Sequence, residues 1–139
     1  MNILITGGSG FIGSNIFHKL KKNHQIFIYD KSVPTFNAKF IKGNLNQKKK
    51  IRFTLKNNNI DCLIHLAASL GVKDTEKNPA KVISVNIDGT KNLLEAIQGS
   101  KVRLVLFSSS SEIYGETKKN GVKENDYFKP KSVYAHTKI

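Results

Sequence analysis

The chain has 139 residues, of which 39% are hydrophobic and 24% are charged, and its formal net charge is +13 at pH 7. This length suits one domain with a buried core but is short for a complete two-domain enzyme. The sequence holds neither a run of roughly eighteen apolar residues nor a signal-peptide pattern, so we expect a cytoplasmic protein without a membrane partner.

The positive charge raises the question of nucleic-acid binding, because a basic face releases counterions from phosphates. Arg52 and Arg103 are the only arginines among 23 basic residues, and the rest are scattered lysines. Arginine is the residue suited to bidentate contacts with phosphates and bases. The composition therefore disfavours a nucleic-acid binder, although the charge can attract an anionic substrate or cofactor over long range.

A glycine-rich turn follows the first predicted strand. Residues 2–6 form a short apolar run bounded by glycine, which favours a core strand over a helix. Gly7, Gly10 and Gly13 follow at three-residue spacing and open a segment with a helical apolar face. One glycine permits the sharp turn, one lets the backbone approach a pyrophosphate, and one allows close packing of helix on strand. The pattern predicts a dinucleotide-binding turn rather than a plain surface loop.

A second predicted strand, residues 25–29, leads into Asp30. Asp30 lies near the offset of about 20 residues at which a carboxylate accepts hydrogen bonds from an adenosine ribose. A carboxylate there repels a 2′-phosphate, so the sequence predicts NAD in preference to NADP. The adjacent Lys31 weakens this preference slightly, because a basic side chain could receive a phosphate.

The rest of the chain alternates strands with helices. We expect a loop over residues 31–38, strands over residues 39–42, 60–66 and 102–107, and helices over residues 47–56 and 78–98. Residues 47–56 are ambiguous between helix and strand, and helix is preferred because parallel strands require a crossover element. A polar loop over residues 116–130 precedes the start of a helix at residues 132–139. The pattern predicts an α/β fold: a Rossmann-type doubly wound parallel sheet, truncated after the fifth strand and the start of the following helix.

Several single residues have two possible interpretations. His65 lies in an apolar run, where a core histidine hydrogen-bonded to backbone is favoured over a ligand or base. Cys62, the only cysteine, is interpreted as a core residue, and one cysteine permits no disulfide and no cysteine-based metal site within the chain. Asn86, Gly89 and Thr90 are unusually polar or small for the middle of a helix, which indicates close packing or a cofactor contact there.

Tyr134 and Lys138 are four residues apart, which places them on one face of the last predicted helix. A phenol is a poor base near neutrality, but an adjacent ammonium and an oxidised nicotinamide would lower its pKa. A hydroxyl from the serine cluster at residues 108–111 could share a proton with this tyrosine. Either pattern by itself has an ordinary explanation, namely a surface helix pair or a loop that turns on itself.

Taken together and in this order, these motifs resemble the extended short-chain dehydrogenase/reductase family, the NAD-dependent epimerases and dehydratases of nucleotide sugars. The matching segments are residues 6–13, Asp30, residues 65–68, residues 86–90, residues 108–115 and residues 134–138. They span the whole chain in family order. The resemblance implies hydride transfer that forms a transient keto-sugar, a nucleotide-diphosphate sugar as substrate, and a homodimer.

The resemblance also implies a role for each matching residue. Tyr134 would be the catalytic base, Lys138 would bind the nicotinamide ribose, and Ser110 would be the hydroxyl partner. Glu112 would be a further catalytic residue, and no metal is implied. Asn44 stands where many members carry an aspartate near the adenine. The residues implied to contact the cofactor are Gly7, Gly10, Phe11, Ile12, Gly13, Asp30, Lys31, Asn44, Leu45, Leu66, Ala67, Ala68, Tyr134 and Lys138.

Two departures from the family pattern leave alternatives open. Ser111 replaces the aspartate of the Asp-Glu pair that is typical of simple dehydratases, and a hydroxyl-Ser-Glu pattern is similar to decarboxylases and to some dehydratases and epimerases. Family members also continue well beyond the point at which this sequence stops. We therefore expect residues 1–139 to be an incomplete NAD(P)-binding Rossmann domain without its C-terminal substrate domain, and a catalytically incompetent cofactor-binding fragment is the alternative function.

Overall fold

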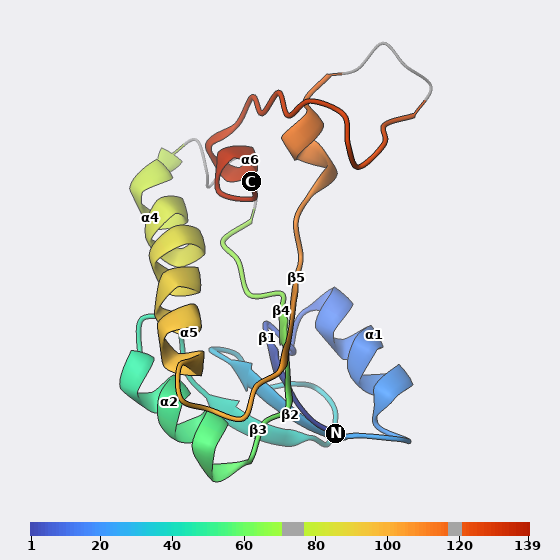
Figure 1. Ribbon diagram of the computed structural model, residues 1–139, viewed down its shortest axis with the longest axis vertical. Coiled ribbons are helices and arrows are strands. Elements are labelled where there is room, and N and C mark those ends of the chain that lie inside the picture. Colours follow the sequence, from blue (N-terminus) through green and yellow to red (C-terminus); the bar gives the residue numbers. More distant parts are fainter. Residues whose placement is uncertain (71–76, 117–120) are drawn as a thin grey trace.

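A computed structural model describes residues 1–70, 77–116 and 121–139 of the chain. These residues form a parallel sheet with the strand order β3-β2-β1-β4-β5, shown in Figure 1. The strands are β1 (Asn2–Thr6), β2 (Gln25–Asp30), β3 (Lys39–Lys42), β4 (Cys62–His65) and β5 (Leu104–Phe107). The chain runs outward from β1 to β3 and then crosses to the other side of β1, which is the predicted doubly wound Rossmann arrangement.

Helices cover the two faces of the sheet (Figure 1). Helix α1 (Phe11–Leu20) packs on one face, whereas α2 (Lys48–Asn57) and α5 (Gly89–Ile97) pack on the other. The interpretation of residues 47–56 as a helix is therefore confirmed. In the part of the chain that the structure describes, no helix is both long and apolar enough to cross a membrane.

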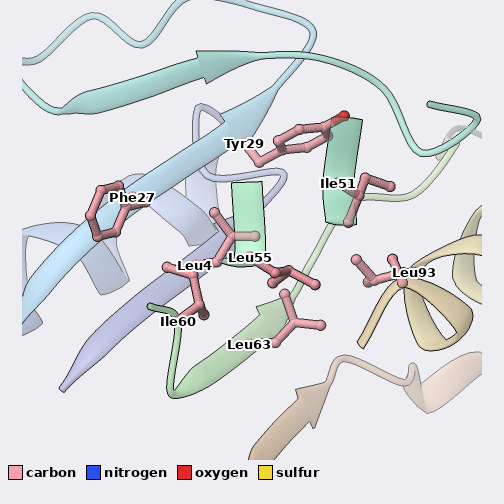
Figure 2. Packing of buried hydrophobic residues seen from close by; sticks show 9 residues of the cluster. Leu4, Phe27, Tyr29, Ile51, Leu55, Ile60, Leu63 and Leu93 are labelled. Atoms are coloured by element: carbon pink, nitrogen blue, oxygen red, sulfur yellow. The ribbon is translucent and has the colours of Figure 1, made fainter. Parts of the chain in front are cut away.

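The core divides into two clusters because side chains alternate along each buried strand. Figure 2 shows the cluster beneath α2 and α5, in which Leu4 and Leu63 of the sheet meet Ile51, Leu55 and Leu93 of the helices. The cluster beneath α1 consists of Ile3, Ile5, Phe17, Ile26, Ile28, Cys62 and Ile64. Cys62 is 3% exposed within this second cluster, so the interpretation of the cysteine as a core residue is confirmed.

The predicted long helix of residues 78–98 is interrupted. It comprises α4 (Pro79–Ile83), a π-helical turn η1 (Ser84–Asp88) and α5. Both predicted ends are confirmed, because the Asn78 side chain accepts a hydrogen bond from the Lys81 N–H and Gly99 has a φ of +71° just after the helix. The interruption falls at the polar and small residues noted in the sequence, where Gly89 packs so closely that a Cβ would lie 2.7 Å from that of Leu45.

The last part of the chain is less covered than the rest. Strand β5 is shorter than the predicted 102–107, and its four residues are 39–49% exposed. A short 3₁₀ turn, η2 (Ser111–Tyr114), follows β5, and α6 (Val133–His136) lies near the chain end. Of the loop predicted over residues 116–130, residues 117–120 lie outside the described part. Within the described residues β5 forms one edge of the sheet, as expected for an open flank.

Candidate cofactor cleft and catalytic group

The three predicted glycines have three different roles in the turn after β1. Gly7 has a φ of +73°, which favours glycine, and a Cβ there would lie 2.6 Å from the backbone nitrogen of Ala67. A Cβ on Gly13 would lie 2.5 Å from the Cα of Gly8, so this glycine permits close packing of α1 against the turn. A Cβ on Gly10 would meet only the Gly7 carbonyl oxygen, at 3.3 Å. Gly10 is therefore the position at which an outside group can approach the backbone.

The N-terminus of α1 is open to an anion. Gly10 is the N-cap and supplies no side-chain hydrogen bond, and the first turn contains no acidic residue. The unsatisfied N–H groups and the positive end of the helix dipole therefore remain available to a phosphate. Phe11 and Ile12 lie beside the turn and are 86% and 56% exposed. The turn thus fits a pyrophosphate in both shape and charge.

A cleft of about 360 Å³ extends from this turn along the carboxyl edge of the sheet. Nine predicted cofactor residues line it: Gly7, Gly10, Asp30, Lys31, Asn44, Leu45, Leu66, Ala67 and Ala68. Five predicted residues do not line it: Phe11, Ile12, Gly13, Tyr134 and Lys138. The sequence prediction missed seven lining residues: Ser9, Tyr29, Ser32, Gly43, Asn46, Leu70 and Val85. Most of the missed residues are immediate neighbours of predicted ones, so their position next to the motif was the available signal.

Asp30 fastens the glycine turn to the loop after β2. Its Oδ2 accepts the backbone N–H of Ser9 at 3.1 Å, and its Oδ1 accepts that of Ser32 at 3.0 Å. The Ser9 hydroxyl also donates to the Ser32 carbonyl oxygen at 2.7 Å. Each carboxylate oxygen retains a further acceptor position, so Asp30 can hold the turn and still receive ribose hydroxyls.

Asn44 is already engaged within its own loop. Its Oδ1 accepts the Asn46 N–H at 3.0 Å, and its backbone carbonyl accepts the Tyr29 hydroxyl at 3.1 Å. Burial raises the pKa of Tyr29 to about 12, so this hydroxyl remains a donor at neutral pH. Because the Asn44 Oδ1 already accepts one hydrogen bond, from Asn46, this side-chain oxygen has one lone pair left for an adenine.

The predicted catalytic residues lie at η2 and at α6, the two short helical segments that follow β5. Ser110 caps η2 by accepting the Glu112 N–H at 3.2 Å, and its hydroxyl is near enough to Tyr134 to act on the pKa of that phenol. The Glu112 carboxylate accepts the hydroxyl of Ser132 at 3.1 Å, and Ser132 in turn caps α6 through the Ala135 N–H. The structure therefore brings Ser110, Glu112 and Tyr134 together, as the sequence predicted.

Lys138 does not share a helix with Tyr134 as predicted, because α6 ends at His136 and Lys138 lies in the following turn. Its Nζ nevertheless lies 5.8 Å from the centre of the Tyr134 ring. It donates to the Ser108 carbonyl oxygen at 2.9 Å and lies 4.8 Å from the centre of the Phe107 ring. Burial lowers the pKa of this lysine.

Lys138, one of the two positive charges expected to lower the Tyr134 pKa, does not lower it from this position. Burial raises this pKa, the interaction with Ser110 opposes the rise, and the charge of Glu112 adds to it. The Lys138 ammonium is directed at a carbonyl oxygen rather than at the phenol oxygen, which explains the difference. Any activation of Tyr134 as a base therefore requires positive charge beyond that of Lys138 in this position.

His65 is buried, as predicted, but its partners are hydroxyl groups rather than backbone. Its Nδ1 lies 2.6 Å from the Thr6 Oγ1, and its Nε2 lies 3.0 Å from the Thr90 Oγ1. Asn86 is also buried and hydrogen-bonds Ser69 and Thr137. The sequence marked the unusual polarity of Asn86 and Thr90 but did not reveal these partners.

The chain resembles known proteins over almost its whole length. It is 31% identical to a UDP-glucose 4-epimerase of Lactobacillus helveticus, covering 100% of this chain and 44% of that protein. It is 37% identical to a UDP-N-acetyl-alpha-D-glucosaminuronate decarboxylase of Bacillus cytotoxicus, covering 81% and 37%. The structure superposes with a TM-score of 0.93 and 28% identity on a Stenotrophomonas maltophila UDP-glucose-4-epimerase crystallised with NAD and formylated UDP-arabinopyranose, covering 99% and 45%.

These proportions mean that the chain spans less than half the length of these relatives. The family description "NAD dependent epimerase/dehydratase family" matches residues 3–139, which is nearly the entire sequence. The glycine turn, the cleft and the tyrosine-lysine pair lie within this range. The chain therefore belongs to the NAD-dependent epimerase/dehydratase family.

Proposed function

We propose that the chain binds NAD in the cleft along the carboxyl edge of its sheet and forms the cofactor-binding part of a nucleotide-sugar epimerase, dehydratase or decarboxylase. The observation that carries the proposal is the continuity of the cleft. It begins at the open N-terminus of α1, passes Asp30 and reaches Ala67 and Ala68. An anion-binding end, a ribose acceptor and a wall of small residues are what a dinucleotide requires in sequence along such an edge.

In this proposal the residues of the chain divide the work of binding and proton transfer. When bound, NAD supplies a hydride acceptor. Gly10 and the first turn of α1 hold the pyrophosphate, and Asp30 holds the adenosine ribose. Tyr134 removes the proton from a sugar hydroxyl, with Ser110 holding that hydroxyl in line. Lys138 contributes charge and a hydrogen bond to the nicotinamide ribose.

The cofactor assignment is tested by calorimetric titration of the 139-residue chain with NAD and with NADP. We expect NAD to bind more tightly, because the Asp30 carboxylate at the edge of the cleft repels a 2′-phosphate. Equal affinities would contradict the role of Asp30, and absence of binding to both would contradict the proposal. ADP-ribose serves as a control, because it retains the pyrophosphate and both riboses without the nicotinamide.

A second candidate function is cofactor binding without turnover. The observations that favour it are the exposure of β5 and the length of the relatives, which are more than twice as long as this chain. Catalysis requires Tyr134 and Lys138 to be held within a few tenths of an ångström by packed neighbours. We therefore expect the chain alone to bind NAD more weakly than a full-length relative and to turn over no nucleotide sugar. Turnover of a UDP-sugar panel by this chain would exclude this second candidate.

The homodimer implied by the family resemblance also belongs to the proposal. Three large apolar residues of the continuous helical segment α4-η1-α5 are 44–51% exposed, namely Ile83, Ile87 and Leu94. Such exposed residues are typical of surfaces that associate. Sedimentation equilibrium of the chain and of Ile87→Lys tests this: we expect the substitution to lower the mass from dimer to monomer. A wild-type chain that is monomeric at all concentrations would contradict the dimer.

A further inference from the structure

His65 occupies a position in the sheet that the proposed catalytic steps do not use. It is the last residue of β4, is 3% exposed, and pairs in register with Thr6 of β1 and with Phe107 of β5. It does not line the cofactor cleft. A polar ring at this depth is stable only with its hydrogen bonds satisfied, so its partners decide what it does.

The hydrogen bonds around His65 have a defined direction. The Thr90 hydroxyl donates to the Asn86 carbonyl oxygen, so it can only accept from His65, and the imidazole proton must lie on Nε2. The unprotonated Nδ1 then accepts the Thr6 hydroxyl. Burial, and secondarily the charge of Lys138, lower the pKa of His65 to about 4, so the ring is neutral at pH 7 and keeps this order.

The series of hydrogen bonds continues beyond Thr90 to α6, the short helix that contains Tyr134. Asn86 lies in the π-helical turn η1, and Thr90 lies just after it in the first turn of α5. Turns of this kind are rare and occur frequently at functional sites. The Asn86 side chain accepts the Ser69 N–H at 2.7 Å and donates to the Thr137 hydroxyl oxygen at 2.9 Å. Thr137 in turn donates to the Tyr134 carbonyl oxygen at 2.7 Å.

We infer that His65 is a positioning residue, which joins the strand beneath the glycine turn to the π-helical turn and thereby holds Asn86 against both the cleft loop and α6. At one end of this hydrogen-bonded chain is Thr6, directly before Gly7 of the phosphate-binding turn. At the other end are Ser69, after the cleft residue Ala68, and Thr137, before Lys138. The inference rests on the proposed NAD site in one respect, namely that the elements held together are those that bind the cofactor.

Packing alone does not require a histidine at this position. Leucine would fill much of the space, but it would leave the Thr6 hydroxyl, which is 0% exposed, without its acceptor and would release Thr90 from the sheet. Glutamine carries one amide acceptor and one amide donor and can reproduce both bonds. The pair His65→Leu and His65→Gln therefore separates the loss of hydrogen bonds from a change of side-chain volume.

The inference is tested with wild-type chain, His65→Leu, His65→Gln and, as a control outside the network, Thr54→Val, which alters a buried threonine of α2. Histidine ¹⁵N spectra at pH 7 should show His65 neutral with its proton on Nε2. Amide exchange should quicken at Ser69 by about tenfold in His65→Leu, as expected for one lost hydrogen bond. The NAD affinity should fall by about tenfold in the same variant. His65→Gln and Thr54→Val should remain within about threefold of wild type in both measurements.

Three results would overturn the inference: a proton on Nδ1, wild-type exchange at Ser69 in His65→Leu, or equal behaviour of the leucine and glutamine variants. A wild-type chain that binds no NAD would contradict the proposed cofactor site instead. The tautomer and the exchange at Ser69 are measured without NAD, so they still decide the role of His65 in that case.

Discussion

The centre of the sheet and its β5 edge differ in how well the described residues cover them. Around β1 and β4, apolar side chains are buried on both faces by α1, α2 and α5. At β5, Ile64 of β4 pairs in register with Leu106, yet Ile64 is 6% exposed and Leu106 is 49% exposed. The half that forms the glycine turn is thus fully packed, whereas the half that carries Tyr134 and Lys138 rests on a strand with little cover.

This difference separates binding from catalysis. A phosphate-binding turn needs only backbone N–H groups and a fixed helix end, both of which the packed half provides. A proton-transfer site needs several side chains held precisely, and side chains on a poorly covered edge are held less well. Under the proposed function, we therefore expect NAD binding to depend less than turnover on the cover of β5.

The largest effects are expected from substitutions in the packed half of the sheet. Gly13→Val places a side chain against Gly8 and should destabilise the chain by about 3 kcal/mol or unfold it. Gly10→Val faces open space beyond the Gly7 carbonyl oxygen, so it should keep its secondary structure but lose NAD affinity by about 100-fold or more. Circular dichroism and NAD titration measure the two effects. Normal NAD binding by Gly10→Val would show that the glycine turn is an ordinary loop that does not bind the pyrophosphate.

A matched pair of alanine substitutions, one in β4 and one in β5, compares the two strands directly. Ile64→Ala should lower the free energy of unfolding by about 3 kcal/mol, because it leaves a cavity in the core beneath α1. Leu106→Ala removes a half-exposed side chain and should cost less than about 1 kcal/mol. Urea unfolding of both variants gives the difference. Equal losses would show that β5 is as well packed in solution as β4.

The buried histidine of the packed half should make the stability of the chain depend on pH. Its pKa is about 4 in the folded chain and 6.5 when unfolded, so the unfolded state takes up a proton first as the pH falls. Stability should be complete above pH 6.5 and should decrease between pH 6.5 and about 4 by up to about 3 kcal/mol. The His65→Gln variant should not show this loss of stability between pH 6.5 and about 4. Parallel pH profiles for the two proteins would mean that the imidazole is not neutral and buried as described.

A smaller effect than those on the packed core is expected for the choice of cofactor. Asp30→Ala removes the ribose acceptor, the bonds to Ser9 and Ser32, and the repulsion of a 2′-phosphate. NAD affinity should fall about tenfold, and the preference over NADP should narrow. Asp30→Asn is the control, because it retains one acceptor oxygen and should lose less. Unchanged affinities for both cofactors in Asp30→Ala would show that Asp30 does not bind the adenosine ribose.

The sequence predicted the features that depend on neighbours along the chain. The alternation of strands and helices, the glycine turn and the cap at Asn78 follow from short-range patterns of apolar residues, glycine and asparagine. The burial of His65 followed from the apolar run around it. These features require no knowledge of which distant residues meet, and the structure agrees with the predictions.

The sequence could not predict features that depend on the approach of distant segments. The bond between Asp30 and Ser9 joins two loops, and the contact of Asn86 with Thr137 joins residues 51 positions apart in the chain. The pKa of Tyr134 depends on where the Lys138 ammonium points, and that direction follows from the end of α6 at His136. The interruption at η1 was signalled by polar residues but not as a π-helical turn.

The position of Cys62 gives the molecule a built-in chemical reporter. Its thiol is buried between the register partners Ile3 of β1 and Leu104 of β5, and burial raises its pKa. Only the exposed thiolate reacts with a disulfide reagent, so the rate of labelling measures how often the sheet opens at this point. Because no other cysteine competes for the reagent, labelling in increasing urea can show whether β5 detaches before the rest of the sheet unfolds.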